Sequence, residues 1–120
     1  MGGAMNMQTD AFLLGADTPV EVVDEGITRQ ILGFNDQIMM VKVWFEEGSQ
    51  GYLHDHFHSQ VTYVAAGEFE VTVGDETRTL VEGDCFFMVP NVPHGAICKK
   101  AGVLIDVFSP KREDFLGDNT

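Results

Sequence analysis

The chain has 120 residues, of which 44% are hydrophobic, and its 19 acidic against 7 basic side chains give a formal net charge of -12. This size and composition suit a single domain with one buried core, and no apolar run approaches the roughly 18 residues of a membrane-spanning helix. The negative charge would repel a phosphate backbone or an anionic bilayer surface, so we expect neither nucleic acid nor a membrane as partner.

The first ten residues, MGGAMNMQTD, lack the basic and apolar regions of a secretory signal. Their glycine pair and three methionines are typical of a disordered or tag-derived terminus, so we place the single domain at residues 11–120. Cys85 and Cys98 lie in apolar runs, where we expect buried free thiols, and such thiols favour a reducing compartment. The sequence therefore predicts a cytoplasmic protein.

Beyond this terminus, turn residues recur about every eight to twelve positions, and the segments between them are rich in β-branched and aromatic residues. This spacing is typical of an all-β sandwich or barrel, and helix signals are nearly absent. In chain order, we expect strands at 28–34, 37–45, 51–58, 61–66, 68–73, 77–81, 85–89, 95–100 and 103–109. The step from Val73 to Glu76 indicates a tight hairpin between two of them.

Three of the four histidines, His54, His56 and His58, occupy alternate positions within five residues. In a strand, residues two apart project from the same face, so His54, His56 and Gln60 are expected to share one face. Imidazoles in an apolar interior need partners for their ring nitrogens, and a divalent ion supplies one at about 2.0–2.1 Å in the case of zinc. A solvated polar strand edge is the alternative, and a ligand set built on His56 and His58 is also geometrically conceivable.

The fourth histidine, His94, follows a turn made of Pro90, Asn91, Val92 and Pro93. The two prolines fix backbone dihedrals there, so His94 begins its strand from a stiff turn, as a preorganised ligand should. This second stretch favours a metal site over a solvated edge.

These residues resemble the motifs of the cupin superfamily. The first motif has the form G-x5-H-x-H-x3,4-E-x6-G, and its matches here are Gly48, His54, His56, Gln60 and Gly67. Glutamine stands where cupins usually have glutamate. The second motif, G-x5-P-x-G-x2-H, is matched more loosely by Gly83, Pro90 and His94, with one extra residue before the proline and the internal glycine replaced. The resemblance implies a small single-domain jelly-roll barrel.

The glutamine and the strings NVPHGA and DVFSPKREDFL narrow the resemblance to the KdgF-type cupins of pectin degradation, over roughly residues 26–116. This implies a homodimer, and the β-rich stretch VEVVDEGITRQILGF could pair with a partner's sheet. It also implies one divalent transition metal per chain, whether Ni, Zn, Mn, Fe or Co, held by His54, His56, Gln60 and His94. The implied catalytic residues are Asp106, Phe108 and Arg112.

The substrate implied by this resemblance is a 4,5-unsaturated monouronate from pectin or alginate, converted to its linear keto form by ring opening and tautomerisation. A metal would act as a Lewis acid, and Asp106 would move the protons. Gln60 is neutral and leaves the ion its full double charge, whereas Arg112 suits a bidentate clamp on the carboxylate.

Each accessory residue also has a structural alternative. Asp106 shares a face with Leu104 and Phe108 and would be solvated if its strand is peripheral. Phe108 would be a core residue, and Arg112 would pair with Glu113 or Asp114 at the surface. Two other functions remain open: a metal-dependent cupin oxygenase, for which glutamine in place of glutamate is unfavourable, and a non-catalytic sugar-binding or uronate-binding cupin.

Overall fold

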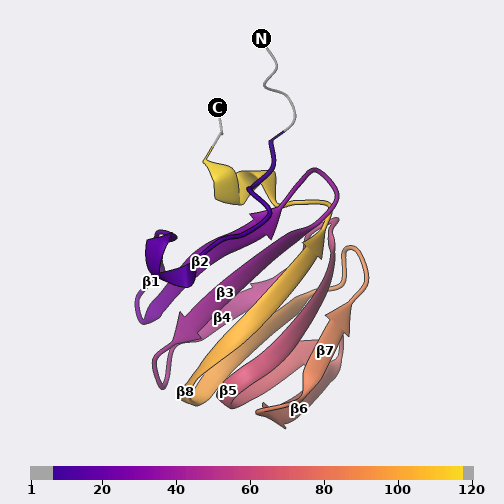
Figure 1. Cartoon of the computed structure of the whole chain (residues 1–120). Helices are drawn as coiled ribbons and strands as arrows, with labels where there is room; N and C mark the ends of the chain where they lie inside the picture. Colours follow the sequence, from indigo (N-terminus) through magenta and orange to yellow (C-terminus); the bar gives the residue numbers. More distant parts are fainter. Residues whose placement is uncertain (1–6, 118–120) are drawn as a thin grey trace.

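The computed structural model describes residues 7–117, which fold into one antiparallel, strand-rich barrel (Figure 1). Two 3-10 turns, η2 (Gly15–Asp17) and η3 (Glu113–Leu116), are the first and last elements along the chain. In chain order the strands are β1 (Glu21–Asp24), β2 (Ile27–Phe34), β3 (Met39–Phe45), β4 (Gln50–His54), β5 (Ser59–Val73), β6 (Glu76–Val81), β7 (Cys85–Met88) and β8 (His94–Ser109). The expected all-β class is therefore confirmed. No helix of the described residues is long and apolar enough to cross a membrane.

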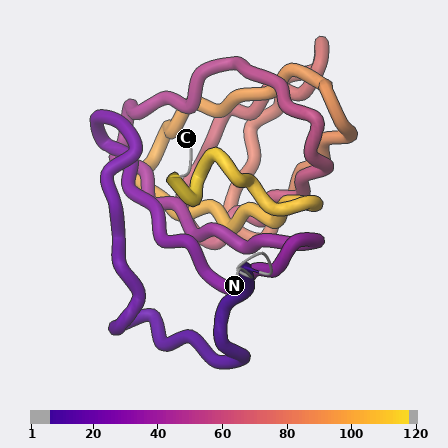
Figure 2. Tube along the Cα trace, turned by 90° about the horizontal axis from the view of Figure 1, so that it is seen from above, coloured from indigo at the N-terminus to yellow at the C-terminus, as the bar shows by residue number. Residues whose placement is uncertain are grey.

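The two longest strands curl the sheet into a barrel because each pairs with different partners along its length. The first part of β8 pairs with β4 and its second part with β3, while β5 pairs first with β7 and then with β6. β5 and β8 also pair with one another over nearly their whole length. Seen end-on, the strands outline a ring, and the C-terminal segment lies across its opening (Figure 2).

Each of these long strands joins two segments that the sequence analysis expected to be separate strands. The junctions contain Gly67 and Gly102, which lie where the two strands approach most closely. A Cβ atom on Gly67 would lie 2.6 Å from the carbonyl oxygen of Ala101, and the φ of Gly67 is 88°. These glycines therefore permit a bulged bend within continuous strands, and the register shifts occur on either side of Gly67.

A second difference concerns the strand expected at residues 51–58. Strand β4 ends at His54, and Asp55 to His58 form a loop that leads into β5. Parity along one strand therefore does not place His56. The hairpin between Val73 and Glu76 is confirmed, with Gly74 in the left-handed region at φ 64°.

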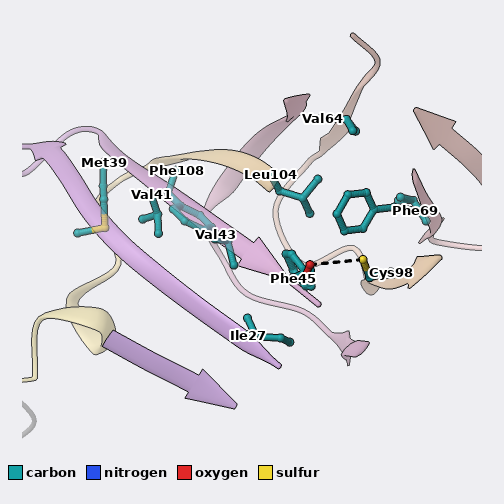
Figure 3. Close-up of a cluster of buried hydrophobic side chains, with 11 residues drawn as sticks. Ile27, Met39, Val41, Val43, Phe45, Val64, Phe69, Cys98, Leu104 and Phe108 are labelled. Carbon is teal, nitrogen blue, oxygen red and sulfur yellow. Dashed lines mark hydrogen bonds between the residues drawn. The ribbon is translucent and has the colours of Figure 1, made fainter. Parts of the chain in front are cut away.

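The core lies inside the barrel, where alternate residues of β3 meet side chains from β5 and β8 (Figure 3). Phe45 and Phe69 pack edge to face with ring centroids 5.2 Å apart. The thiol of Cys98 is buried beside them and lies 3.8 Å from the carbonyl oxygen of Phe45. Cys85 is free but exposed, so its expected burial is wrong: in β7 the alternation turns Phe86 and Met88 inward and Cys85 outward.

Part of the terminus expected to be disordered or tag-derived, residues 1–6, lies outside the described residues. Within residues 7–10, the amide and hydroxyl of Thr9 both hydrogen-bond with the backbone of Phe34, at 3.0 and 3.2 Å. The following segment leaves the barrel wall (Figure 2), and Gln30 anchors it by donating to the carbonyls of Gly15 and Thr18.

Candidate metal centre and adjoining pocket

Three histidines come together at one end of the barrel from three different backbone positions. His54 is the last residue of β4 and lies opposite His94, the first residue of β8, while His56 belongs to the loop between β4 and β5. The ring centroids of His54 and His94 are 4.4 Å apart, and those of His56 and His94 are 4.9 Å apart. One ligand nitrogen from each histidine lies within 4.8 Å of the others. The three residues form a group that could hold a metal ion.

Backbone carbonyls determine which ring nitrogen of each histidine is available. Nδ1 of His54 contacts the carbonyl of Tyr52 at 2.8 Å, Nδ1 of His56 contacts that of His58 at 3.1 Å, and Nδ1 of His94 contacts that of Val92 at 2.9 Å. A carbonyl only accepts, so each Nδ1 must donate. In the neutral rings, Nε2 is then the unprotonated nitrogen, which is the form that binds a divalent ion.

The charge state of the rings agrees with this role. Burial lowers the pKa of His94 to about 4, and the neighbouring rings of His54 and His56 act in the same direction. Burial also lowers the pKa of His56. Both rings are therefore neutral near pH 7. Nε2 of His94 is buried without a hydrogen-bond partner among the described residues, a costly arrangement that a bound cation would relieve.

Gln60, on strand β5, places a fourth polar side chain beside the three histidines. Its amide nitrogen donates to Thr62 Oγ1 at 2.9 Å and lies 3.4 Å from Asp106 Oδ1, and the hydroxyl of Thr62 donates to the same Asp106 oxygen at 2.7 Å. These bonds orient the amide so that Oε1 points toward His56 Nε2, 2.9 Å away. Gln60 therefore presents an acceptor beside the three imidazoles, and this donor set of nitrogen and neutral oxygen fits a divalent transition metal.

A cavity of about 260 Å³ adjoins these side chains. His54, Gln60 and His94 line it on one side, and Asp106, Phe108 and Arg112 also contribute to its wall. Asp106 is positioned by β8, which is paired there with Val41 of β3 on one side and Thr62 of β5 on the other. The structure thus brings all seven residues expected at the site to one end of the barrel.

The carboxyl group of Asp106 is held in an environment that favours its neutral form. Burial raises the pKa of Asp106 to about 6, against the hydrogen bond from Thr62 and the positive charge of Arg112, which both lower it. A carboxyl group with a pKa near neutrality can both give and take a proton. The solvated-face alternative for Asp106 does not describe this position.

Phe108 and Arg112 each make the contacts of the structural alternative and also line the cavity. Phe108 is 2% exposed and belongs to the core, yet its ring packs 5.8 Å from that of His56 and forms part of the cavity wall. Arg112 pairs with Asp114 through Nε at 3.0 Å and Nη2 at 2.9 Å, as the surface alternative supposed. Its side chain is nevertheless only 12% exposed and reaches the cavity.

His58 is not a member of the three-histidine group, although it is 5% exposed and its ring centroid lies 5.2 Å from that of His56. Its ring stacks on Phe57 with centroids 4.0 Å apart and lines a second groove, together with His56 and the Pro110 to Asp114 segment. Two further residues of this region, Thr62 and Arg29, belong to no sequence motif; Arg29 lies on β2 and lines the cavity. Only strand parity, with Arg29 between Ile27 and Ile31, would have indicated that Arg29 faces inward.

A small bent barrel with a cluster of histidines inside one end is the arrangement of a cupin. The family model described as Cupin domain matches residues 41–108, and the chain belongs to the cupin family. Within that family it is similar to KdgF: it is 46% identical to "Pectin degradation protein KdgF" of Dickeya dadantii (strain 3937) over 107 residues, which are 88% of this chain and 97% of that protein. The expected resemblance is therefore confirmed.

Solved structures agree with this assignment. A crystal structure of an RmlC-like cupin from Shewanella frigidimarina NCIMB 400 is 51% identical, with a TM-score of 0.88, and the match covers 90% of this chain and 97% of that one. The structure of KdgF from Halomonas sp. is 36% identical, with a TM-score of 0.85 and coverage of 89% and 99%.

Proposed function

We propose that this chain is an enzyme that converts 4,5-unsaturated monouronates, released from pectin or alginate, to their linear keto form. The observation that carries the proposal is the position of Asp106 beside Gln60 in a cavity that His54 and His94 of the three-histidine group also line. The cavity is smaller than the range typical for drug-sized ligands, which suits a single sugar unit. Similarity to KdgF proteins, one of them named for pectin degradation, supports the same substrate class.

A divalent transition metal held by His54, His56, His94 and Gln60 would supply a Lewis acid for the oxygen on which charge develops when the ring opens. The chain's own groups move the protons. Asp106 takes the proton from the anomeric hydroxyl and returns one to C4, and its pKa of about 6 suits both steps. Thr62 keeps the carboxyl group in place through its hydrogen bond to Oδ1.

The other residues of the cavity wall bind the substrate and exclude water. Arg112 binds the substrate carboxylate through guanidinium donors that Asp114 leaves available. Phe108 provides an apolar wall between that carboxylate and the ring of His56. Together these contacts hold the sugar ring in one orientation against Asp106.

We further propose a homodimer formed through the outer face of the sheet. Across strands β3, β8, β5 and β7, one row of partners is Met40, Val107, Val61 and Phe87, and the next is Lys42, Ile105, Tyr63 and Cys85. Both rows contain no acidic residue, although the chain carries a net charge of -12. Phe87 is 60% exposed and Tyr63 is 49% exposed, so a second copy of this face would bury apolar area that now meets water. We place the protein in the cytoplasm, which its two free thiols support.

The decisive experiment is incubation of metal-loaded protein with unsaturated galacturonate monomer while the absorbance of its conjugated alkene is followed. Catalysed loss of absorbance above the spontaneous rate is the expected result. Oxygen consumption coupled to turnover would instead identify an oxygenase. Binding of the sugar acid without any accelerated loss would identify a non-catalytic cupin.

A further inference from the structure

Two of the chain's three arginines, Arg29 and Arg112, line the cavity beside the histidine group. Asp106 is the one acidic side chain among the described residues that form this wall. These two guanidiniums are the groups of the wall that can bind an anion, and Glu21 and Asp114 each occupy only part of one of them.

Arg29 reaches the cavity from the inner face of β2, where it is paired with Val43 of β3. Its guanidinium carbon lies 4.0 Å from the ring centroid of Phe115, and that of Arg112 lies 4.3 Å from the same centroid. Phe115 belongs to η3, in the segment that crosses the barrel opening (Figure 2). Two like charges therefore converge on one aromatic side chain at the mouth of the cavity.

The remaining contacts of Arg29 leave part of its guanidinium available. Its Nε donates to Glu21 Oε1 of β1 at 2.8 Å, and within residues 7–117 its two terminal nitrogens make no hydrogen bond. The side chain is only 18% exposed. A carboxylate placed between Arg29 and Arg112 would offset the repulsion between them and accept the paired donors of a guanidinium edge.

We propose that Arg29 is a second substrate-binding residue, which holds the carboxylate of the uronate together with Arg112. The proposal rests on the proposed function for its substrate class. Recognition of an acid sugar over a neutral one would then depend on two segments far apart in the sequence, strand β2 and the segment after β8. Phe115 orients both guanidiniums by packing against them.

The test compares Arg29→Gln and Arg29→Lys with Arg78→Gln as the matched control. Arg78 also donates its Nε to a glutamate at 2.8 Å, but its side chain is 74% exposed on β6 and does not line this cavity. Two sets of quantities are measured on metal-loaded protein. The first is KM and kcat with unsaturated galacturonate, and the second is the dissociation constants of galacturonate and of galactose by calorimetry. Arg29→Gln should raise KM about 10-fold or more with a smaller change in kcat, as expected when a charged hydrogen bond to a carboxylate is lost.

Arg29→Gln should also lose preference for galacturonate over galactose, Arg29→Lys should retain part of it, and Arg78→Gln should match the wild type. Because Arg29 also packs on Phe115, the thermal midpoint of each variant is recorded as a measure of folding. If Arg29 has a purely structural role, Arg29→Gln weakens the binding of galacturonate and galactose equally. That result overturns the proposal. A KM for Arg29→Gln within about twofold of the wild-type KM also overturns the proposal for Arg29. If the wild type still turns over the unsaturated uronate, the proposed function stands in that case. A wild type that neither turns over the unsaturated uronate nor prefers galacturonate refutes both.

Discussion

Oε1 of Gln60 and Nε2 of His56 lie 2.9 Å apart, although the surrounding hydrogen bonds make both of them acceptors. Nδ1 of His56 donates to a carbonyl, and the amide nitrogen of Gln60 donates to Thr62, so neither group has a proton left for the other. Two lone pairs directed at one point are stable when a cation lies between or beside them. Gln60 thus connects the candidate metal centre to Asp106, both directly and through Thr62.

Replacing Gln60 with glutamate tests this link. Gln60→Glu should retain the metal, because a carboxylate is also a ligand, but should lower turnover by about 10–100-fold, the range typical when the surroundings of a metal site change. The new carboxylate loses the donor to Thr62 and lies beside Asp106, where like charges repel, and it cancels one unit of the metal's charge. Metal content and the turnover rate are measured on the same sample. Unchanged turnover at full metal occupancy would show that a neutral ligand is not required.

Loss of one imidazole should remove the metal outright. His94→Ala is expected to lose bound metal and activity together, while His58→Ala, a matched deletion of an equally buried histidine, should keep both. Metal per chain is measured by elemental analysis after dialysis, and the rise in thermal midpoint on metal addition reports binding without reference to activity. If His58→Ala also loses the metal, the set that includes His58 is the correct one.

Sequence periodicity predicted histidines that the structure does bring together, but through an incorrect local geometry. His54, His56 and Gln60 share parity, but β4 ends at His54, and the three side chains converge because the loop after it turns back into β5. His94 joins them because β4 pairs with the start of β8, a long-range pairing that no local pattern encodes. Asp106 shares a face with Leu104 and Phe108, as parity predicts, because β8 is regular there.

Arg29 and the long strands show where sequence reasoning stopped. The strands expected at 61–66, 68–73, 95–100 and 103–109 leave Gly67 and Gly102 between them, whereas close approach of two backbones requires these glycines inside continuous strands. Arg29 lies in a strand with no motif around it. Its position at the cavity is recognised only from its contact with Phe115, which is 86 positions later in the chain.

The proton-transfer role of Asp106 predicts a selective kinetic defect. Asp106→Asn should lower kcat by about 10²–10⁴-fold, because the isosteric amide preserves shape but does not exchange the proton. Metal content and KM should change little, since Asp106 is not one of the expected ligands. The rate is measured by alkene absorbance with metal occupancy determined in parallel. Near-normal turnover at full occupancy would assign the acceleration to the metal alone.

The bend in β5 predicts an unusually sensitive glycine. Gly67→Ala should destabilise the barrel by about 2–4 kcal/mol, combining left-handed strain with overpacking against the backbone of β8. Gly48→Ala is the matched control, because Gly48 has a φ of 89° but nothing within 4 Å of its Cβ position, so only strain of about 1–2 kcal/mol applies. Urea unfolding of both variants gives the two free energies. Equal losses would mean that the close strand approach is not required for the fold.

Association of two copies through the outer sheet face predicts which substitution separates them. Tyr63→Glu places a negative charge in the second of these two largely apolar rows and should yield a monomeric mass by light scattering, while the wild type remains dimeric. Val22→Glu is the matched change in β1, where Val22 is 79% exposed, and it should leave the dimer intact. Dissociation by Val22→Glu and not by Tyr63→Glu would instead place the interface at the N-terminal strands. A wild type that is monomeric at working concentration would contradict both arrangements, and the apolar rows would then be open to another partner.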